Sequence, residues 1–122
     1  MKKIQRMSDA EKQIMEFIWS VKGPVTTKDI IGNLPEGKTW KKNTVITFLS
    51  RLTDKGILTA TKIGKAHHYE PCLTEEEYKL FETKQFIQDV HKGSLVGFLS
   101  TLCGSGDLTK EDIEELRKKL KE

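Results

Sequence analysis

The sequence has few of the features that mark secreted, membrane or redox proteins. It holds two cysteines and three prolines among 122 residues, and it contains no apolar run of about 18 residues, the length that spans a membrane. Cys72 and Cys103 form no CxxC or CxC pair, so we expect two reduced structural thiols. The basic N-terminus has no apolar stretch behind it and does not read as a signal peptide. We therefore expect a cytoplasmic protein.

Motifs for catalysis and metal binding are missing as well. The chain has no Gly-rich phosphate loop, no nucleophile elbow and no HExxH motif. His67 and His68 are neighbours in an extended segment, so they point to opposite faces and are poorly placed to share a metal ion. Glu75, Glu76 and Glu77 are typical of a helix start, where negative charge complements the helix dipole. We expect no enzyme activity, no metal and no cofactor.

Charge is divided unevenly along the chain. Residues 1–71 hold 13 Lys and Arg against 7 Asp and Glu, whereas residues 72–122 hold 8 against 11. A basic half joined to an acidic half predicts different partners for the two halves. The basic half is a candidate for binding a polyanion.

The basic half carries the pattern of three short helices. Ser8 and Glu11 form a capping box at the start of the first helix, and Gly23-Pro24 ends that helix. A short second helix follows. The third helix is predicted to run from about residue 40 or 41 to Lys55, and its polar face lacks glutamate.

After the third helix the hydrophobic period changes from 3.6 to 2. Residues 57–63 and 66–70 read as two strands joined by a turn that contains Gly64-Lys65. Three helices followed by a hairpin predict a winged helix-turn-helix DNA-binding domain over residues 1–71. The fold class is therefore mainly α with a small β-hairpin wing.

Residues 72–122 are predicted to form a three-helix dimerisation domain. Thr74 caps a helix that runs to about His91, the next runs from Ser94 to about Leu102, and a flexible break at 104–106 precedes the last. The middle helix is apolar around most of its circumference, which indicates that it is buried. A two-fold dimer would cover it; the alternative is that these helices fold back on the winged helix. The residues expected in a dimer interface are Phe81, Phe86, Ile87, Val90, Leu95, Phe98, Leu99, Leu102, Ile113, Leu116 and Leu120.

Nine residues of the third helix and the wing are candidates for DNA contact: Lys41, Lys42, Asn43, Thr44, Ile46, Thr47, Arg51, Lys62 and Lys65. Lys41 and Lys42 would contact phosphates at the helix start, or form a solvated charge pair. Asn43, Thr44 and Thr47 would read base edges, although Asn43 or Thr44 would also serve as helix caps.

The remaining candidates have alternatives of the same kind. Ile46 would pack on a thymine methyl or be a tolerated exposed residue. Arg51 would reach a phosphate, or would pair with Asp54 or Glu16. The wing lysines would reach the flanking backbone or minor groove, or would only keep the turn soluble.

Several stretches resemble the penicillinase-repressor family of winged-helix regulators. They are MSDAEKQIMEFIW, TWKKNTVITFLSRLTDKGIL, HHYEP, FIQDVHKGS and DLTKEDIEELRKKL, which together cover nearly the whole chain. The last two are similar to the β-lactam-resistance branch of BlaI and MecI. The copper-responsive CopY branch carries C-terminal Cys-x-Cys motifs, and the present chain has none.

The resemblance implies a homodimeric repressor that places its third helix in the major groove of a palindromic operator. In the BlaI and MecI branch this operator would control β-lactam-resistance genes. It also implies release through cleavage of the dimerisation segment by a membrane-bound sensor protease. The aligned cleavage point is Thr101-Leu102, where the family has Asn-Phe, so the same protease specificity does not follow. Ile46 stands where staphylococcal repressors have arginine. An alternative function is a winged-helix protein-interaction module without sequence-specific DNA binding.

Overall fold

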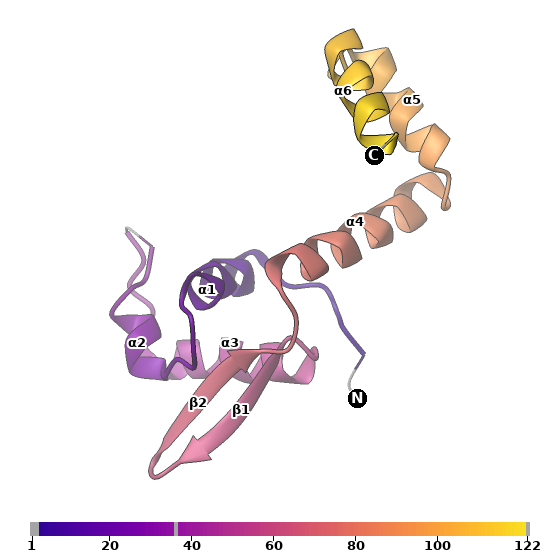
Figure 1. Cartoon of the computed structure of the whole chain (residues 1–122). Coiled ribbons are helices and arrows are strands. Elements are labelled where there is room, and N and C mark those ends of the chain that lie inside the picture. Colours follow the sequence, from indigo (N-terminus) through magenta and orange to yellow (C-terminus); the bar gives the residue numbers. More distant parts are fainter. Residues whose placement is uncertain (1–2, 36, 122) are drawn as a thin grey trace. The chain divides into compact units, whose positions relative to one another are not determined.

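The computed structural model describes residues 3–35 and 37–121, so Met1, Lys2, Glu36 and Glu122 lie outside the described residues. Within that part the chain forms six helices and one antiparallel two-stranded sheet (Figure 1). The elements are α1 (Asp9–Ser20), α2 (Thr27–Ile31), α3 (Lys42–Asp54), β1 (Leu58–Ile63), β2 (Ala66–Pro71), α4 (Glu75–His91), α5 (Leu95–Ser105) and α6 (Lys110–Leu120). This confirms the predicted fold class. No helix among these residues is long and apolar enough to cross a membrane.

The chain divides into two compact units, Met1–Tyr78 and Lys79–Glu122, which we call the N-terminal unit and the C-terminal unit. The prediction divided the chain after Pro71. The N-terminal unit continues further because Leu73 and Tyr78 are only 8% and 5% exposed and belong to its core.

The N-terminal unit is a winged helix whose α1 packs against α2, α3 and β2. The predicted capping box is present: Ser8 Oγ accepts from the Glu11 backbone N–H, and Glu11 Oε1 accepts from the Ser8 N–H. The helix then buries Ile14, Met15 and Ile18 on one side. β1 and β2 pair from Leu58 opposite Pro71 to Ile63 opposite Ala66.

Gly56 sets the end of α3. Its φ of 77° is left-handed, a conformation that glycine adopts without steric cost. The Gly56 N–H donates to the Thr53 carbonyl and the Ile57 N–H to the Leu52 carbonyl, the two bonds of a Schellman motif. The chain therefore turns from α3 directly into the hairpin.

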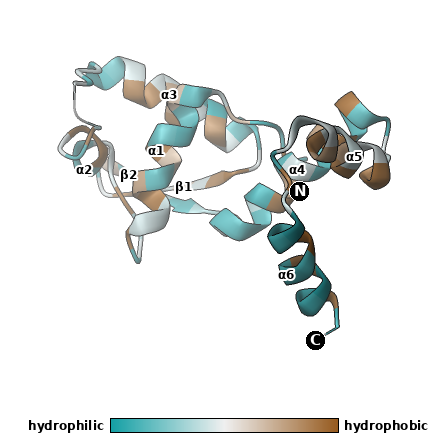
Figure 2. Cartoon of the chain, turned by 90° about the horizontal axis from the view of Figure 1, so that it is seen from above, coloured by the Kyte–Doolittle hydropathy of each residue, from teal (hydrophilic) through white to brown (hydrophobic). Residues whose placement is uncertain are grey.

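The C-terminal unit contains the rest of α4 together with α5 and α6. Thr109 caps α6 with a capping box, and Ser94 caps α5. The predicted break at 104–106 is wrong in its extent. Gly104 and Ser105 continue α5, and the helix ends at Gly106, whose φ is 85°. Figure 2 shows that α5 is mostly apolar, whereas α6 is mostly polar with a thin apolar stripe.

Candidate nucleic-acid interface

One face of α3 is fixed in the core and the opposite face is open. Val45, Leu49 and Leu52 are fully buried. Because a helix repeats every 3.6 residues, their burial leaves Lys42, Ile46 and other residues of the opposite face exposed. Ile46 is 38% exposed and adds an apolar side chain to this face.

The exposed threonine of this face is already bonded within the helix. Thr47 Oγ1 donates to the Asn43 carbonyl oxygen at 2.9 Å. The hydroxyl proton is therefore occupied, and the side chain presents its methyl group and an oxygen lone pair. This favours apolar contact, or acceptance of a hydrogen bond, over donation.

α3 begins without a side-chain cap. Its N-cap residue is Lys41, which makes no capping bond, and neither Asn43 nor Thr44 caps it. The helices α1, α2, α4, α5 and α6 each begin with a Ser or Thr hydroxyl that accepts from their first turn. The first N–H groups of α3 are thus left for an external acceptor, and a phosphate oxygen would be favoured there.

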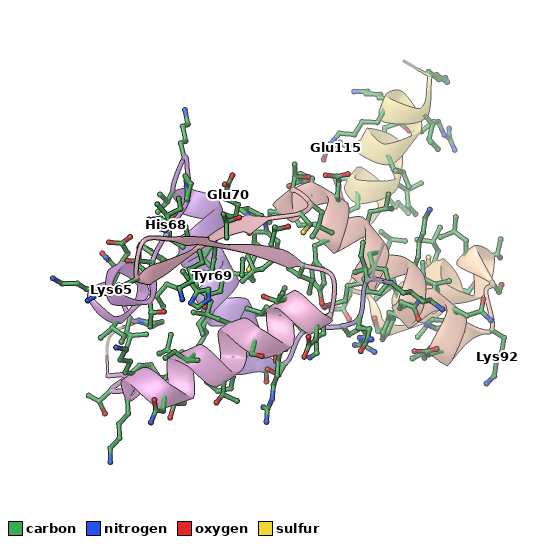
Figure 3. The ribbon with its side chains drawn as sticks, turned by 90° about the horizontal axis from the view of Figure 1, so that it is seen from below. Lys65, His68, Tyr69, Glu70, Lys92 and Glu115 are labelled. Carbon is green, nitrogen blue, oxygen red and sulfur yellow. The ribbon has the colours of Figure 1, made fainter. Side chains whose placement is uncertain are left out.

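A groove of about 920 Å³ lies between α2, α3 and the hairpin. Its walls come from three elements, and Figure 3 shows Lys65 near the hairpin turn and Tyr69 on the side of the hairpin toward α3. Its lining residues are Thr26, Thr27, Lys28, Ile31, Lys42, Ile46, Ser50, Thr53, Asp54, Ala60, Lys65, Ala66, His67 and Tyr69.

The groove gathers positive charge. Lys28, Lys42 and Lys65 line it together with a single acidic residue, Asp54. Sequence reasoning missed Lys28, since α2 has five residues and gave a weak pattern. It also missed His67 and Tyr69. The strand register places Tyr69 opposite Ala60 and His67 opposite Lys62. Because side chains alternate between the two faces of a strand, residues 67 and 69 share one face, and this spacing could have predicted that both line the groove.

The other candidates lie around this groove rather than in it. Asn43, Thr47 and Arg51 are exposed on α3, Thr44 is half-buried, and Lys62 is exposed on β1. Arg51 is exposed, so a phosphate could reach its side chain.

A partly buried ion pair holds the far end of α3 to α1. Lys55 Nζ lies 2.6 Å from Glu11 Oε1, and the Glu11 side chain is 1% exposed. Burial alone would raise the pKa of the Glu11 carboxyl, but hydrogen bonds from Lys55 and from the Ser8 amide outweigh it and lower this pKa. The carboxylate therefore stays charged and positions α3.

The residues predicted for dimerisation are all exposed or half-buried in the single chain. Leu95, Leu120 and Val90 are 56%, 76% and 57% exposed, and no residue of α5 or α6 is buried. The rings of Phe86, His91 and Phe98 lie within 6.1 Å of one another at the α4–α5 turn. Of the predicted cleavage pair, Thr101 is exposed and Leu102 half-buried, and both lie inside α5.

The chain is similar to known repressors along almost its whole length. The family model "Penicillinase repressor" matches residues 7–122. A penicillinase repressor of Bacillus licheniformis is 33% identical over 100% of this chain and 94% of that protein. The methicillin resistance regulatory protein MecI of Staphylococcus aureus is 31% identical over 94% of this chain and 93% of that protein.

Two of the similar solved structures each cover 64% of this chain. The DNA-binding domain of the repressor BlaI aligns with a TM-score of 0.56 at 38% identity, covering 64% of this chain and 94% of that one. The monomeric form of Bacillus licheniformis BlaI in complex with the blaP half-operator aligns with a TM-score of 0.51 at 38% identity, with the same coverage. The second of these was solved on DNA.

Proposed function

The chain belongs to the penicillinase repressor family, and from this premise we propose that it is a homodimeric transcriptional repressor that binds a palindromic operator. It would act in the bacterial cytoplasm. The observation that carries the proposal is the uncapped α3, whose open face forms one wall of a lysine-lined groove. A relative with this domain was solved on half-operator DNA.

Base recognition is assigned to the open face of α3. Placed in the major groove, Ile46 and the Thr47 methyl would contact thymine methyl groups, and the Asn43 amide would pair with adenine. The Asn43 side chain is exposed and does not cap α3. An apolar Ile46 cannot read guanine as an arginine would, so the operator would differ there from one read by arginine.

Phosphate contacts are assigned to the groove rim and to the start of α3. Lys41 and Lys42 stand beside the unbonded first-turn N–H groups, and Lys65 stands on the hairpin side. Lys28 on α2 extends this set, with Lys62 and Arg51 exposed nearby on β1 and α3. These contacts position the protein without reading sequence.

Dimerisation is assigned to the C-terminal unit. Its apolar residues are exposed in the single chain, and a second copy would cover them around a two-fold axis. Two winged helices joined in this way would occupy two half-sites. The half-site centres would lie about 34 Å apart, or a small multiple of that distance.

Induction by proteolysis is assigned to α5. A cut at Thr101-Leu102 would remove α6 and the end of α5, which leaves too little apolar surface to hold a dimer. Thr101 Oγ1 donates to the Gly97 carbonyl, so the bond lies in an ordered helical turn that must open before cleavage. A membrane-bound sensor protease and control of β-lactam-resistance genes are the corresponding partner and target.

The test distinguishes residues that recognise the base sequence from residues that only contact the phosphate backbone. Operator DNA is selected from random sequence with the full chain, and binding is measured on this site and on random DNA. Thr47→Ala should weaken specific binding by about 1–3 kcal/mol and leave non-specific binding intact. Lys42→Ala should weaken both alike and reduce the salt slope by about one.

Lys22→Ala, an exposed lysine outside the groove, is the matched control and should change neither value. If Thr47→Ala and Lys42→Ala lose affinity equally on every DNA, α3 is not the reading element. A protein that selects no DNA site at all would favour a protein-interaction module.

A further inference from the structure

Tyr78 makes a hydrogen bond to a residue far away in the sequence. Its hydroxyl accepts from the Met7 backbone N–H at 2.8 Å, across 71 positions, and both residues are buried. Tyr78 also lies in the first turn of α4 and is buried in the core, a role that requires only an apolar ring. Phenylalanine would fill that role, so the hydroxyl serves the additional bond.

Trp19 makes a second connection to the same segment. Its Nε1–H donates to the Leu73 carbonyl at 3.0 Å, and its ring lies 6.1 Å from that of Tyr78. Leu73 immediately precedes the Thr74–Glu77 capping box of α4. The entry to α4 is therefore bonded to α1 through Trp19 and to the segment just before α1 through Tyr78, and we call Trp19 and Tyr78 the latch.

The N-terminal segment connects the latch to the recognition helix. The Gln5 N–H donates to the Lys55 carbonyl at the end of α3, and two residues later the Met7 N–H donates to Tyr78. Lys55 is also the partner of buried Glu11. Two hydrogen bonds, of 3.1 and 2.8 Å, thus join the end of α3, residues 5–7 and the first turn of α4, all within the N-terminal unit.

We propose that Tyr78 is a positioning residue for operator recognition, which with Trp19 holds the start of α4 to the winged helix and so restricts the half-site spacings that the dimer binds. The inference rests on the proposed dimeric repressor. α4 is one continuous helix from Glu75 to His91 and leads into the C-terminal unit. When the first turn of α4 is held to the winged helix, a change in half-site spacing strains other parts of the dimer or the DNA. When it is released, each winged helix can follow its own half-site.

The experiment compares the full chain with Tyr78→Phe, Trp19→Phe and the double variant. The probes are the operator selected by the wild-type chain, the same half-sites moved apart or together by one and two base pairs, and an isolated half-site. Each inserted pair rotates a half-site by about 35°. Wild type should lose at least about tenfold in affinity at two pairs, and the double variant less than about threefold. Affinity for the isolated half-site should stay within about twofold.

Ile14→Val is the control for a general loss of stability, since Ile14 is buried in α1 but takes no part in the latch. Its denaturant midpoint is compared with those of the latch variants, and its spacing profile should match that of wild type. Equally steep profiles in wild type and the double variant would overturn the latch, as would a parallel loss on the isolated half-site. A wild-type chain that selects no two-fold site would instead overturn the proposed function.

Discussion

The two units of this chain use apolar residues in opposite ways. In the N-terminal unit α3 has a modest apolar content, yet Val45, Leu49 and Leu52 are fully buried. In the C-terminal unit α5 is the most apolar helix, yet none of its residues is buried. Among the described residues, every buried side chain lies at or before Tyr78. The apolar content of a helix thus indicates that it should be buried. Whether it is buried within one chain depends on whether that chain supplies another apolar surface to pack against it.

The difference assigns a separate task to each unit. The N-terminal unit has its own core and presents an open groove, so it can fold and meet DNA as one chain. The C-terminal unit exposes Val96 and Leu120 by about three quarters, at 75% and 76%. Exposed apolar patches of this kind mark interaction sites. This contrast supports the proposed division, in which the C-terminal unit would form the dimer and the N-terminal unit would bind DNA.

The largest expected effect comes from removing part of the C-terminal unit. Truncation after Thr101 should lower affinity for a two-half-site operator by about 10²–10⁴-fold, because the two half-sites are then bound independently. The N-terminal unit should remain folded, since its core ends at Tyr78. Operator titration and circular dichroism of the fragment check both statements. A fragment that keeps full operator affinity would contradict this division of tasks.

A smaller effect is expected from one apolar residue of α6. Leu116 is 43% exposed in the single chain, so Leu116→Ala should change little if that chain is the functional form. If a second copy covers Leu116, the substitution should weaken the dimer by about 2 kcal/mol or more. Lys118→Ala on the same exposed helix is the control. The dimer dissociation constant, measured by sedimentation velocity across a dilution series, shows whether Leu116 is covered in a dimer or stays exposed in a single chain.

A third prediction concerns the N-terminal unit alone. Glu11→Gln removes the charge that pairs with Lys55 and should lower the free energy of unfolding of this unit by about 1–3 kcal/mol. The dimer constant should be unaffected. Urea unfolding of the Glu11→Gln, Lys55→Met and double variants forms a cycle that measures the pair. A coupling energy near zero would show that the contact does not position α3.

The smallest effect is the pH dependence of the same pair. The folded-state pKa of Glu11 lies below its ordinary value of 4.5. Its stabilisation is therefore complete above that ordinary value and is lost as pH falls toward the folded-state pKa. Wild type should lose stability below about pH 4.5 more steeply than Glu11→Gln. Unfolding free energies of wild type and Glu11→Gln, measured between pH 3 and 6, would show this steeper loss. Parallel pH curves for the two proteins would refute it.

Local chemistry made much of the N-terminal unit predictable. Ser8 with Glu11 and Gly56 after α3 specify helix ends through bonds within a few residues, so the pattern predicts them directly. The helical spacing of apolar residues in α3 predicted the open face that lines the groove. The hydrogen bond of Thr47 to Asn43 and the inclusion of Lys28 in the groove were not predictable, because they depend on rotamers and on the packing of α2 against α3.

Long-range contacts account for what the sequence did not predict. Glu11 reads as a capping residue, and only the fold brings Lys55 to it from 44 positions away. Tyr78 reads as an apolar staple, and only the fold shows that its hydroxyl meets Met7. The predicted break at 104–106 failed because one left-handed glycine, Gly106, is sufficient to end α5. Glycine content alone does not locate the turn.

Sedimentation equilibrium of the full chain without DNA tests the central claim most directly. If the exposed faces of α5 and α6 are completed by a second copy, the chain should have twice the mass of one chain at micromolar concentration. Leu116→Ala should shift this equilibrium toward the single chain. A full-length protein that sediments as one chain at all concentrations tested would contradict the account, because the apolar surface of the C-terminal unit would then need a different partner.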